Sequence, residues 1–253
     1  MIDLHCHILP GIDDGPESMD DALEMCRIAA GDGIRTVVAT PHCYMGRYAN
    51  DASTILPVYD LLRRRIREEG IDLTLLVAGD KHIDPDLAFF LQDNPSLCPG
   101  GRFVLIELPS EVVPRYIGQF LFALRVKGFT PILTHPERNR MIQHCPALVE
   151  EWLPGGVLTQ LTAMSLTGEF GAVAQRTSFA LLDRGCVDFV ATDAHSPEWR
   201  RPVLSTVTAL LRERIGEEGA RRLVQENPRR ILAGQNPLKI EQIRRHDVVQ
   251  NFA

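Results

Sequence analysis

Short apolar runs alternate with longer segments of helical period along almost the whole chain. The runs are rich in Val, Ile, Leu and Thr, and most of them are bounded by Gly or Pro, which is typical of buried parallel strands. We therefore expect seven strands, near residues 2–5, 36–40, 73–79, 103–108, 131–135, 157–161 and 187–193.

The segments between these runs carry the signals that begin and end helices. Residues 18–30 have acids in the first turn and Gly31 at the end, and residues 51–69 become Arg-rich before Gly70, which suits the helix dipole. Pro57 is expected to kink or divide the second of these helices. Further helices are expected at residues 85–91, 114–127, 146–153, 170–184, 201–215 and 217–226, followed by a short helix or tail.

The alternation of strand and helix without an interrupting linker predicts an α/β fold. Seven such units favour a single closed barrel, one unit shorter than the common eightfold TIM barrel. A doubly wound open sheet is the alternative. At 253 residues the chain can bury one large core, so we expect residues 1–253 to form a single domain.

Imidazoles and carboxylates recur where the expected strands end. These side chains are His5, His7, His42, Asp80, Glu107, His135, Asp193 and His195. In barrels the functional groups gather at the carboxyl ends of the strands, so we expect these donors to converge. Such a donor set is what a multinuclear metal site requires, and a site of this kind activates water. The pattern therefore points to a hydrolase.

The individual motifs differ in strength. His5 and His7 alternate along a strand and face the same way, although two polar residues at a strand exit explain a lone pair equally well. Asp193 and His195 repeat this geometry with a carboxylate beside the imidazole. Glu107 ends an apolar run, where an unpaired carboxylate is costly and requires an Arg or a cation as partner.

Three further segments add polar groups near strand ends. Residues 13–16 (Asp-Asp-Gly-Pro) place acids in a tight turn, which turn chemistry alone explains. Residues 134–138 (Thr-His-Pro-Glu-Arg) bring an imidazole, an acid and a guanidinium together, and this grouping is the more persuasive. His42 follows Pro41, and a single histidine in such a place is more often a hydrogen-bonded structural residue than a ligand.

The bulk properties exclude several classes. A net charge of −6 argues against nucleic-acid binding, which depends on basic side chains that neutralise phosphates, so we expect no nucleic-acid partner. The chain begins with a strand-like run instead of a leader, and no apolar stretch is long enough to cross a bilayer, which predicts a cytoplasmic protein. The six cysteines form no Cys-x-x-Cys pair and are expected to be buried thiols. None has an Arg six positions later, so a cysteine-dependent phosphatase has little support.

Taken in order along the chain, these motifs resemble the polymerase and histidinol phosphatase (PHP) superfamily. The closer resemblance is to its bacterial branch of manganese-dependent protein-tyrosine phosphatases from capsule and exopolysaccharide operons, the CpsB/YwqE type. It rests on residues 1–16, on Thr-Pro-His at 40–42, His-Pro-Glu-Arg at 135–138, Thr-Asp-Ala-His at 192–195 and Glu-Asn-Pro-Arg-Arg-Ile-Leu at 226–232. The Asp-Asp-Gly-Pro and His-x-Glu-Arg elements are more specific to this branch than His-x-His is.

The resemblance implies a distorted seven-stranded barrel with a three-metal site at its mouth. Mn²⁺ is the metal that the family implies first, and Fe or Zn²⁺ also suit the donors. Matched position by position, the implied ligands are His5, His7, Asp14, His42, Asp80, Glu107, His135, Asp193 and His195.

The same matching implies the groups that handle phosphate. Arg138 matches the arginine that the branch places against the substrate phosphate. The second phosphate-binding arginine matches Arg200 without a gap, and Arg201 is the alternative. A phenolate leaving group has a pKa of about 10, so it needs little help from a general acid. His42 or a metal ion could supply that help.

One position departs from the family pattern. The third strand of the family usually ends Gly-x-Glu, with a Glu that bridges two metals, whereas this chain has Asp80, one methylene shorter. Asp80 could still bridge, His82 could serve instead, or Asp80 could bind a single ion. His82, His144 and His246 have no match in the family, and we interpret them as surface or structural residues.

The resemblance implies a metal-dependent phosphoric monoester hydrolase that acts on the tyrosine-phosphorylated tail of a bacterial autokinase controlling capsule or exopolysaccharide synthesis. A histidinol-phosphate or other small phosphomonoester phosphatase is one alternative, and an inactive, metal-stabilised interaction module is another. The loops 44–50 and 107–115 are candidate elements of the mouth. Tyr44, Arg47 and Arg115 could contact the peptide, although solvated loop residues are an equally good interpretation.

Overall fold

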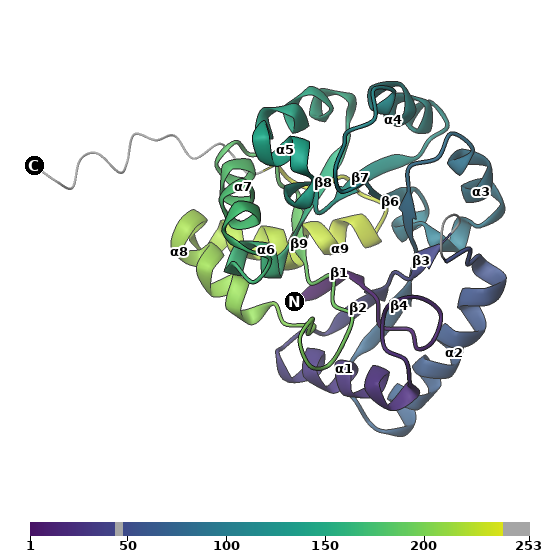
Figure 1. Ribbon diagram of the computed structural model, residues 1–253. Helices are drawn as coiled ribbons and strands as arrows, with labels where there is room; N and C mark the ends of the chain where they lie inside the picture. Colours follow the sequence, from purple (N-terminus) through teal and green to yellow (C-terminus); the bar gives the residue numbers. More distant parts are fainter. Residues whose placement is uncertain (44–47, 240–253) are drawn as a thin grey trace, which may run out of the picture.

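The computed structural model describes residues 1–43 and 48–239 and is built on parallel strands (Figure 1). Within these residues the strands are β1 (Ile2–Cys6), β2 (Thr36–Ala39), β3 (His42–Cys43), β4 (Thr74–Val77), β5 (Asp80–His82), β6 (Phe103–Glu107), β7 (Thr130–Thr134), β8 (Leu158–Thr162) and β9 (Phe189–Ala191). Each of the seven expected strands overlaps one of them.

Two of the expected strands, 36–40 and 73–79, are followed at once by a second short strand. β2 pairs with β4, and β3, which follows β2 after Pro41, pairs with β5. Pro41 lacks the amide donor that would continue the first ladder. Gly79 separates β4 from β5. A Cβ at this position would lie 2.5 Å from Cys43 Sγ, so the close approach to β3 requires glycine. After the break, the first residues of β3 and β5, His42 and Asp80, lie opposite each other in register.

The strands follow one another in chain order around a ring (Figure 1). One ladder has the order β1-β2-β4, and the other has the order β3-β5-β6-β7-β8-β9. Among the described residues, β1 meets the segment after β9 through a single parallel bridge, Cys6 with Ala194, and no ladder closes the ring. The α/β barrel-like fold is therefore confirmed, and the sequential strand order excludes a doubly wound open sheet.

Helices cover the outside of the strands in Figure 1. They are α1 (Met19–Gly31), α2 (Ala52–Glu68), α3 (Leu87–Asp93), α4 (Ile117–Val126), α5 (Arg140–His144), α6 (Ala163–Thr167), α7 (Ala172–Asp183), α8 (Ser205–Arg221) and α9 (Asn227–Leu232). Short helical turns lie between them at η1 (Pro95–Leu97), η2 (Pro99–Gly101), η3 (Pro136–Arg138), η4 (Pro146–Glu151), η5 (Leu153–Gly155) and the π-helical η6 (Arg222–Glu226). None of the described helices is long and apolar enough to cross a membrane.

Several helix expectations need correction. Pro57 lies inside α2 without dividing it. The expected helix 146–153 consists of two short 3₁₀ turns. Residues 201–204 are not helical, and α8 runs through the expected boundary near 216, where Gly216 interrupts the helical backbone with a φ of 77°. The five-residue helices α5 and α6 are too short to leave a periodic pattern in the sequence.

The core has two parts, which together leave one end of the ring free. Inside the ring, strand side chains such as Leu4, Phe103 and Phe189 pack with Ile231 of α9. A larger apolar cluster lies between the strands and the outer helices. Because α9 closes the end where the strands begin, the opposite end, where they finish, is open for a site.

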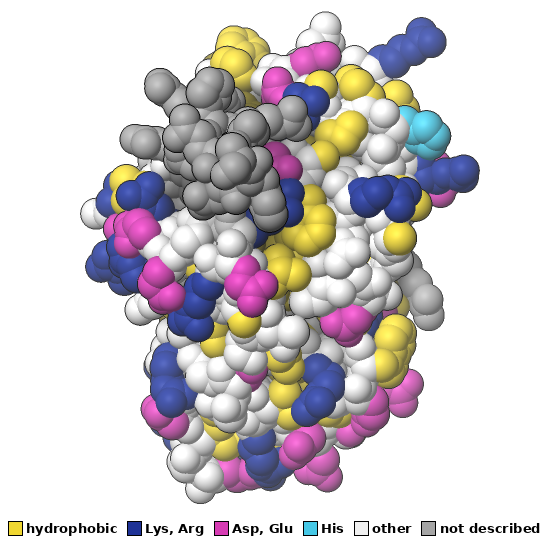
Figure 2. All heavy atoms as spheres, turned by 90° about the vertical axis from the view of Figure 1, so that its left-hand side faces the viewer, with side chains coloured by type: hydrophobic (Ala, Val, Ile, Leu, Met, Phe, Trp, Pro, Cys, Tyr) yellow, Lys and Arg dark blue, Asp and Glu magenta, His cyan; other side chains and the backbone are white. Residues whose placement is uncertain are grey.

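The outer surface carries mixed charge on the side that bears α7 and α8. In Figure 2, Lys and Arg side chains alternate with Asp and Glu over the visible part of this face, and no broad field of one sign is seen there. The visible part of this face therefore shows no continuous basic surface of the kind that binds nucleic acid.

Candidate metal centre

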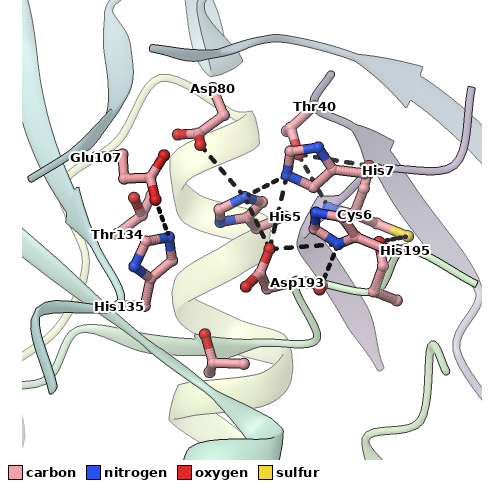
Figure 3. Close-up of polar contacts among 12 residues, drawn as sticks. His5, Cys6, His7, Thr40, Asp80, Glu107, Thr134, His135, Asp193 and His195 are labelled. Atoms are coloured by element: carbon pink, nitrogen blue, oxygen red, sulfur yellow. Dashed lines mark hydrogen bonds and ion pairs between the residues drawn. The ribbon is translucent and has the colours of Figure 1, made fainter. Parts of the chain in front are cut away.

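The expected donors meet at the open end of the ring, and Figure 3 labels all of them except Asp14 and His42. They fall into four overlapping groups whose ligand atoms lie within 4.8 Å of one another. The groups are His7 with Asp14, His42 and His195; His5 with His7 and Asp193; His42 with His82 and Glu107; and Asp80 with Glu107 and His135. All nine residues expected as ligands belong to at least one group, and His82 joins them.

The two histidines of β1 form the inner wall of the site. Their Nε2 atoms are 3.1 Å apart, and both side chains are almost fully buried. Asp193 Oδ1 lies 3.5 Å from His5 Nε2 and 3.6 Å from His7 Nε2. Two imidazole nitrogens and a carboxylate oxygen that converge in this way can hold one cation between them.

Two side chains that the sequence analysis did not assign orient these imidazoles. Asp13 Oδ2 accepts a hydrogen bond from His7 Nδ1 at 2.7 Å, and Gln160 Oε1 accepts one from His5 Nδ1 at 2.8 Å. Each bond places the ring proton on Nδ1 and leaves Nε2 free to bind a cation. Gln160 lies in the fully buried strand β8, and a polar residue in such a strand was the sequence signal that could have pointed to this role.

The turn at residues 13–15 places two neighbouring acids in different roles. Asp13 Oδ2 also accepts from the His42 amide at 3.0 Å, and its Oδ1 accepts from the Gly15 amide at 2.9 Å, so Asp13 is part of the scaffold. Asp14 instead reaches the site, where its Oδ1 lies 3.4 Å from His195 Nε2. A Cβ at Gly15 would lie 2.4 Å from the His7 carbonyl oxygen, so the turn requires glycine there.

Asp80 provides the clearest evidence that the site fits a cation. Its carboxylate is 1% exposed, and neither oxygen has a hydrogen-bond partner. Burial, reinforced by the charges of Glu107 and Asp193, raises the pKa of Asp80 well above its usual range. A buried carboxylate without partners is costly. A divalent cation would supply the missing partner.

His42 lies between two carboxylates. Its Nδ1 is 3.5 Å from Asp80 Oδ2, and its Nε2 is 3.6 Å from Asp14 Oδ1. Burial lowers the pKa of His42 to about 4. The neutral ring that results is the form that binds a cation, whereas a general acid must be protonated.

The backbone is strained at two site residues. Among the described residues, only His135 (φ 34°) and Asp193 (φ 52°) have a positive φ without being glycine. Such a conformation costs roughly 1–3 kcal/mol and is least unfavourable for small polar residues and His. Both residues follow the end of a strand, and the left-handed turn aims their side chains into the site.

The polar side chains of residues 135–138 do not all point into the site, although the sequence suggested that they lie together. His135 Nε2 lies 3.6 Å from Glu107 Oε1 at the site. Glu137 is fully buried, and it accepts a hydrogen bond from the Thr162 amide of β8 at 3.0 Å. Glu137 therefore anchors η3, while His135 and Arg138 remain as the site groups of this segment.

Two guanidinium groups stand beside the donors. Arg138 Nη1 and Arg200 Nη2 both donate to Asp193 Oδ2, each at 2.7 Å. Both groups also lie over the ring of Phe170, at 4.8 Å and 5.6 Å from its centre. Arg200 Nε is buried and has no hydrogen-bond partner. Two cations held side by side with a free donor suit a phosphate dianion.

Of the two candidate arginines, Arg200 contacts Asp193 and lies beside the donors. Arg201, the alternative, lines a separate hollow on the far side of Trp199 and does not line the hollow beside the donors. The contribution of Phe170 was not predicted, because the contacts of its ring with Arg138 and Arg200 depend on how the loop before α7 folds.

The open end is hollowed mainly along segments that the sequence analysis did not assign to the mouth. A cavity of about 460 Å³ runs from Asp14, His195 and Arg200 past Glu17 to the exposed Trp199. Of the expected mouth loops, Glu107, Leu108 and Ser110 line a hollow of about 20 Å³ beside Arg138, and Arg115 lines none of the described hollows. Tyr44 and Arg47 lie outside the described residues.

The remaining histidines and the cysteines occupy varied positions. His82 is half-exposed, as expected of a surface residue, but its Nδ1 lies 3.4 Å from Glu107 Oε2 at the site. His144 contacts the Arg140 carbonyl oxygen on the surface, and His246 lies outside the described residues. All six cysteines are free; five are buried as expected, whereas Cys145 is exposed.

Imidazoles and carboxylates at the carboxyl ends of barrel strands are the arrangement of metal-dependent hydrolases, and this is the class that the fold and the site define. A family model described as "Capsular polysaccharide synthesis, CpsB/CapC" matches residues 1–233. The chain belongs to this CpsB/CapC family. The resemblance found in the sequence motifs is thereby confirmed.

Relatives and solved structures agree with this family. The chain is 36% identical to tyrosine-protein phosphatase YwqE of Bacillus subtilis, covering 86% of each chain. It is 34% identical to the putative tyrosine-protein phosphatase CapC of Staphylococcus aureus, covering 78% of this chain and 77% of the relative. The chain also superimposes on a crystal structure with a TM-score of 0.88 and 34% sequence identity, covering 95% of this chain and 97% of that one. That structure belongs to a set described as "YwqE from Bacillus subtilis and CpsB from Streptococcus pneumoniae, unique metal-dependent tyrosine phosphatases".

Proposed function

We propose that the protein is a metal-dependent protein-tyrosine phosphatase, and thus a phosphoric monoester hydrolase. One observation carries this proposal. Asp193 belongs to the imidazole and carboxylate cluster and also accepts hydrogen bonds from Arg138 and Arg200, so candidate cation ligands and phosphate-binding groups lie side by side. YwqE is named a tyrosine-protein phosphatase and CapC a putative tyrosine-protein phosphatase, which supports the same activity here.

The ligands in this proposal are the nine residues matched from the family. Three ions are expected, with Mn²⁺ as the first candidate from the family resemblance and Fe or Zn²⁺ as metals that the oxygen and nitrogen donors also accept. Ions held there would supply Lewis acidity, which makes water a stronger nucleophile near neutral pH. The proposed ligands are His5, His7, Asp14, His42, Asp80, Glu107, His135, Asp193 and His195.

The proposed role of Arg138 and Arg200 is to bind the phosphate and the charge that builds on its oxygens. A guanidinium carries five N–H donors. Arg138 uses one on Asp193, and Arg200 uses Nη2 on the carboxylate and carbonyl oxygens of Asp193, while its Nε has no partner. The remaining donors are therefore available for phosphate oxygens, and Asp193 keeps the two cations in place.

Departure of the phenolate needs little proton donation, because its pKa is about 10. We assign His42 to the ligand set, since both of its ring nitrogens face carboxylates. The lowered pKa of His42, about 4, disfavours the alternative in which a protonated His42 acts as general acid.

The substrate proposed is a phosphotyrosine on the flexible tail of a bacterial tyrosine autokinase that controls capsule or exopolysaccharide synthesis. Such a tail can enter the 460 Å³ cavity, which begins at Asp14 and Arg200 and ends at Trp199, 72% exposed. Phosphotyrosine is formed where ATP is available, so we place the reaction in the cytoplasm.

A substrate comparison tests this proposal. The metal-loaded protein is expected to hydrolyse a phosphotyrosine peptide with a higher kcat/KM than histidinol phosphate, because the open cavity accepts an extended chain. A preference for histidinol phosphate would replace the assignment with the small-substrate phosphatase. Bound ions without hydrolysis of either compound would indicate the inert scaffold.

A further inference from the structure

Glu107 faces an imidazole with each of its two carboxylate oxygens. Oε1 lies 3.6 Å from His135 Nε2, and Oε2 lies 3.4 Å from His82 Nδ1. A carboxylate whose two oxygens each face a different imidazole is suited to bind a cation through each oxygen. The first side belongs to the ligand set already proposed, whereas His82 on the second side has no assigned role.

The position of His82 follows from strand geometry. Asp80 and His82 are two residues apart in β5, so they project from the same face of the strand. His82 is in register with Glu107 on β6, and Asp80 is in register with His42 on β3. The short strand thus presents a carboxylate and an imidazole to the same end of the ring.

His82 also meets His42. Their rings stack with centres 5.6 Å apart and planes inclined by 16°, and ligand atoms of His42, His82 and Glu107 lie within 4.8 Å of one another. Asp80 lies beside this group, but its closest imidazole approaches are 3.5 Å to His42 and 3.8 Å to His5. The side chain that faces Glu107 Oε2 is that of His82.

We propose that His82 is a metal ligand of this protein, binding the ion on the Oε2 side of Glu107 and replacing the reach that a longer carboxylate at position 80 would have. The inference rests on the metal centre of the proposed function and adds a ligand to it. It also gives a reason why the chain can use Asp80.

The test measures bound metal, independently of catalysis. Full-length protein is stripped with chelator, titrated with Mn²⁺ and analysed by elemental analysis and by the Mn²⁺ signal in electron paramagnetic resonance. His82→Ala is expected to weaken the weakest-bound ion by roughly tenfold or more, or to lose it. His144→Ala, which removes a histidine remote from the site, is expected to bind as the wild type does.

A second variant separates ligation from hydrogen bonding. His82→Asn keeps an amide nitrogen near the position of Nδ1, which can still donate to Glu107 Oε2, but an amide is a much poorer ligand than imidazole. Binding weakened in both His82→Ala and His82→Asn supports the proposal. Wild-type binding in His82→Asn or in His82→Ala overturns it.

A third comparison tests the link to Asp80. In the Asp80→Glu variant the longer carboxylate should bind the ion that His82 binds in the wild type. Adding His82→Ala to Asp80→Glu is therefore expected to change metal affinity by less than about twofold, whereas His82→Ala alone should lower it roughly tenfold. An equal loss in both backgrounds overturns the replacement. A wild-type protein that binds the ions but hydrolyses no phosphotyrosine would contradict the proposed function and leave the role of His82 intact.

Discussion

At the scale of single residues, Asp193 joins the two halves of the site. Its Oδ1 faces His5 and His7, and its Oδ2 accepts from Arg138 and Arg200. Burial alone would raise the pKa of Asp193, but its polar neighbours, with the His5 imidazole and the Arg200 guanidinium foremost, hold it well below its usual range. Asp193 is therefore ionised, and each oxygen has a separate task.

Asp193→Asn should remove the charge while keeping the fold, because Asn tolerates the positive φ of this position. We expect loss of at least one bound ion and at least about a hundredfold lower kcat/KM, since both the ligand and the anchor of the arginines are weakened. Elemental analysis and phosphopeptide kinetics measure this. Asp183→Asn, at an exposed ion pair with Arg214, is the matched control. Unchanged metal content would remove Asp193 from the ligand set.

Arg138→Ala should separate phosphate binding from metal binding. The ions should remain, because the guanidinium is no ligand, while transition-state stabilisation falls by about 2–4 kcal/mol. This corresponds to a ~30- to ~900-fold lower kcat/KM. Arg140→Ala, at an exposed ion pair with Glu111, is the control. Wild-type kinetics in Arg138→Ala would exclude it from the site.

Phe170 should act by positioning both guanidiniums. Phe170→Leu removes the ring that Arg138 and Arg200 contact, and a cation–π contact is worth about 0.5–1 kcal/mol for each. We expect a roughly 5- to 30-fold lower kcat/KM and weaker inhibition by phosphate, with metal content unchanged. Phe170→Tyr keeps the ring, so kcat/KM and inhibition by phosphate should both be close to the wild-type values. Failure of Phe170→Tyr to do so would indicate a purely structural role.

Some residues of the site could be predicted from the sequence and others could not. The ligands stand at strand ends beside apolar runs, so their positions followed from periodicity. Asp13 and Asp14 are adjacent in one turn, and only the folded chain decides which one orients His7. Gln160 meets His5 across 155 residues, a contact that no local pattern encodes.

At the scale of elements, local signals set the strands but not their interruptions. Gly and Pro bounded the apolar runs correctly, whereas the second short strands were not predicted. β3 begins after Pro41, and β5 begins after Gly79, which packs closely against Cys43. Helices were predicted at residues 146–153 and 217–226, but the 3₁₀ geometry of η4 and η5 and the π geometry of η6 were not, because their hydrogen bonds are set by tertiary packing.

A tertiary cap links α1 to α8. Asp32, the residue after α1, accepts hydrogen bonds from the amides of Leu204 at 2.6 Å and Ser205 at 2.9 Å, where α8 begins. Asp32→Ala leaves these amides without that acceptor, so the free energy of unfolding should fall by about 1–2 kcal/mol. Chemical denaturation measures this.

The cap should matter for stability alone. Asp72→Ala, which removes another carboxylate from the surface, is the control and should be nearly neutral, because its partner Arg35 is also exposed. Metal content and phosphatase activity of folded Asp32→Ala should match the wild type. An unchanged denaturation midpoint for Asp32→Ala would show that water replaces the cap without cost.

At the scale of the whole molecule, the ring places a charged site at one end and seals the other with α9. Access is therefore from one side, along the cavity that leads to Trp199. An extended substrate must cross this surface, whereas a small phosphomonoester needs only the charged groups at the centre.

Trp199→Ala should therefore distinguish substrates by size. The indole is 72% exposed at the end of the cavity, so it offers an aromatic surface to residues that flank the phosphotyrosine. We expect KM for a phosphotyrosine peptide to rise roughly 5- to 30-fold, with p-nitrophenyl phosphate turnover unchanged. Steady-state kinetics with both substrates measure this. Equal effects on both substrates would show that Trp199 supports the site's structure and does not contact the peptide.

The most direct test of the central claim is a metal titration in which bound ions and phosphotyrosine-peptide hydrolysis are measured on the same samples. The stripped protein should be inactive, and hydrolysis should rise as Mn²⁺ fills the sites. Arg138→Ala should take up the same ions with much slower turnover. Full loading without hydrolysis, or full hydrolysis by the stripped protein, would contradict the claim that the clustered imidazoles and carboxylates form a catalytic metal centre.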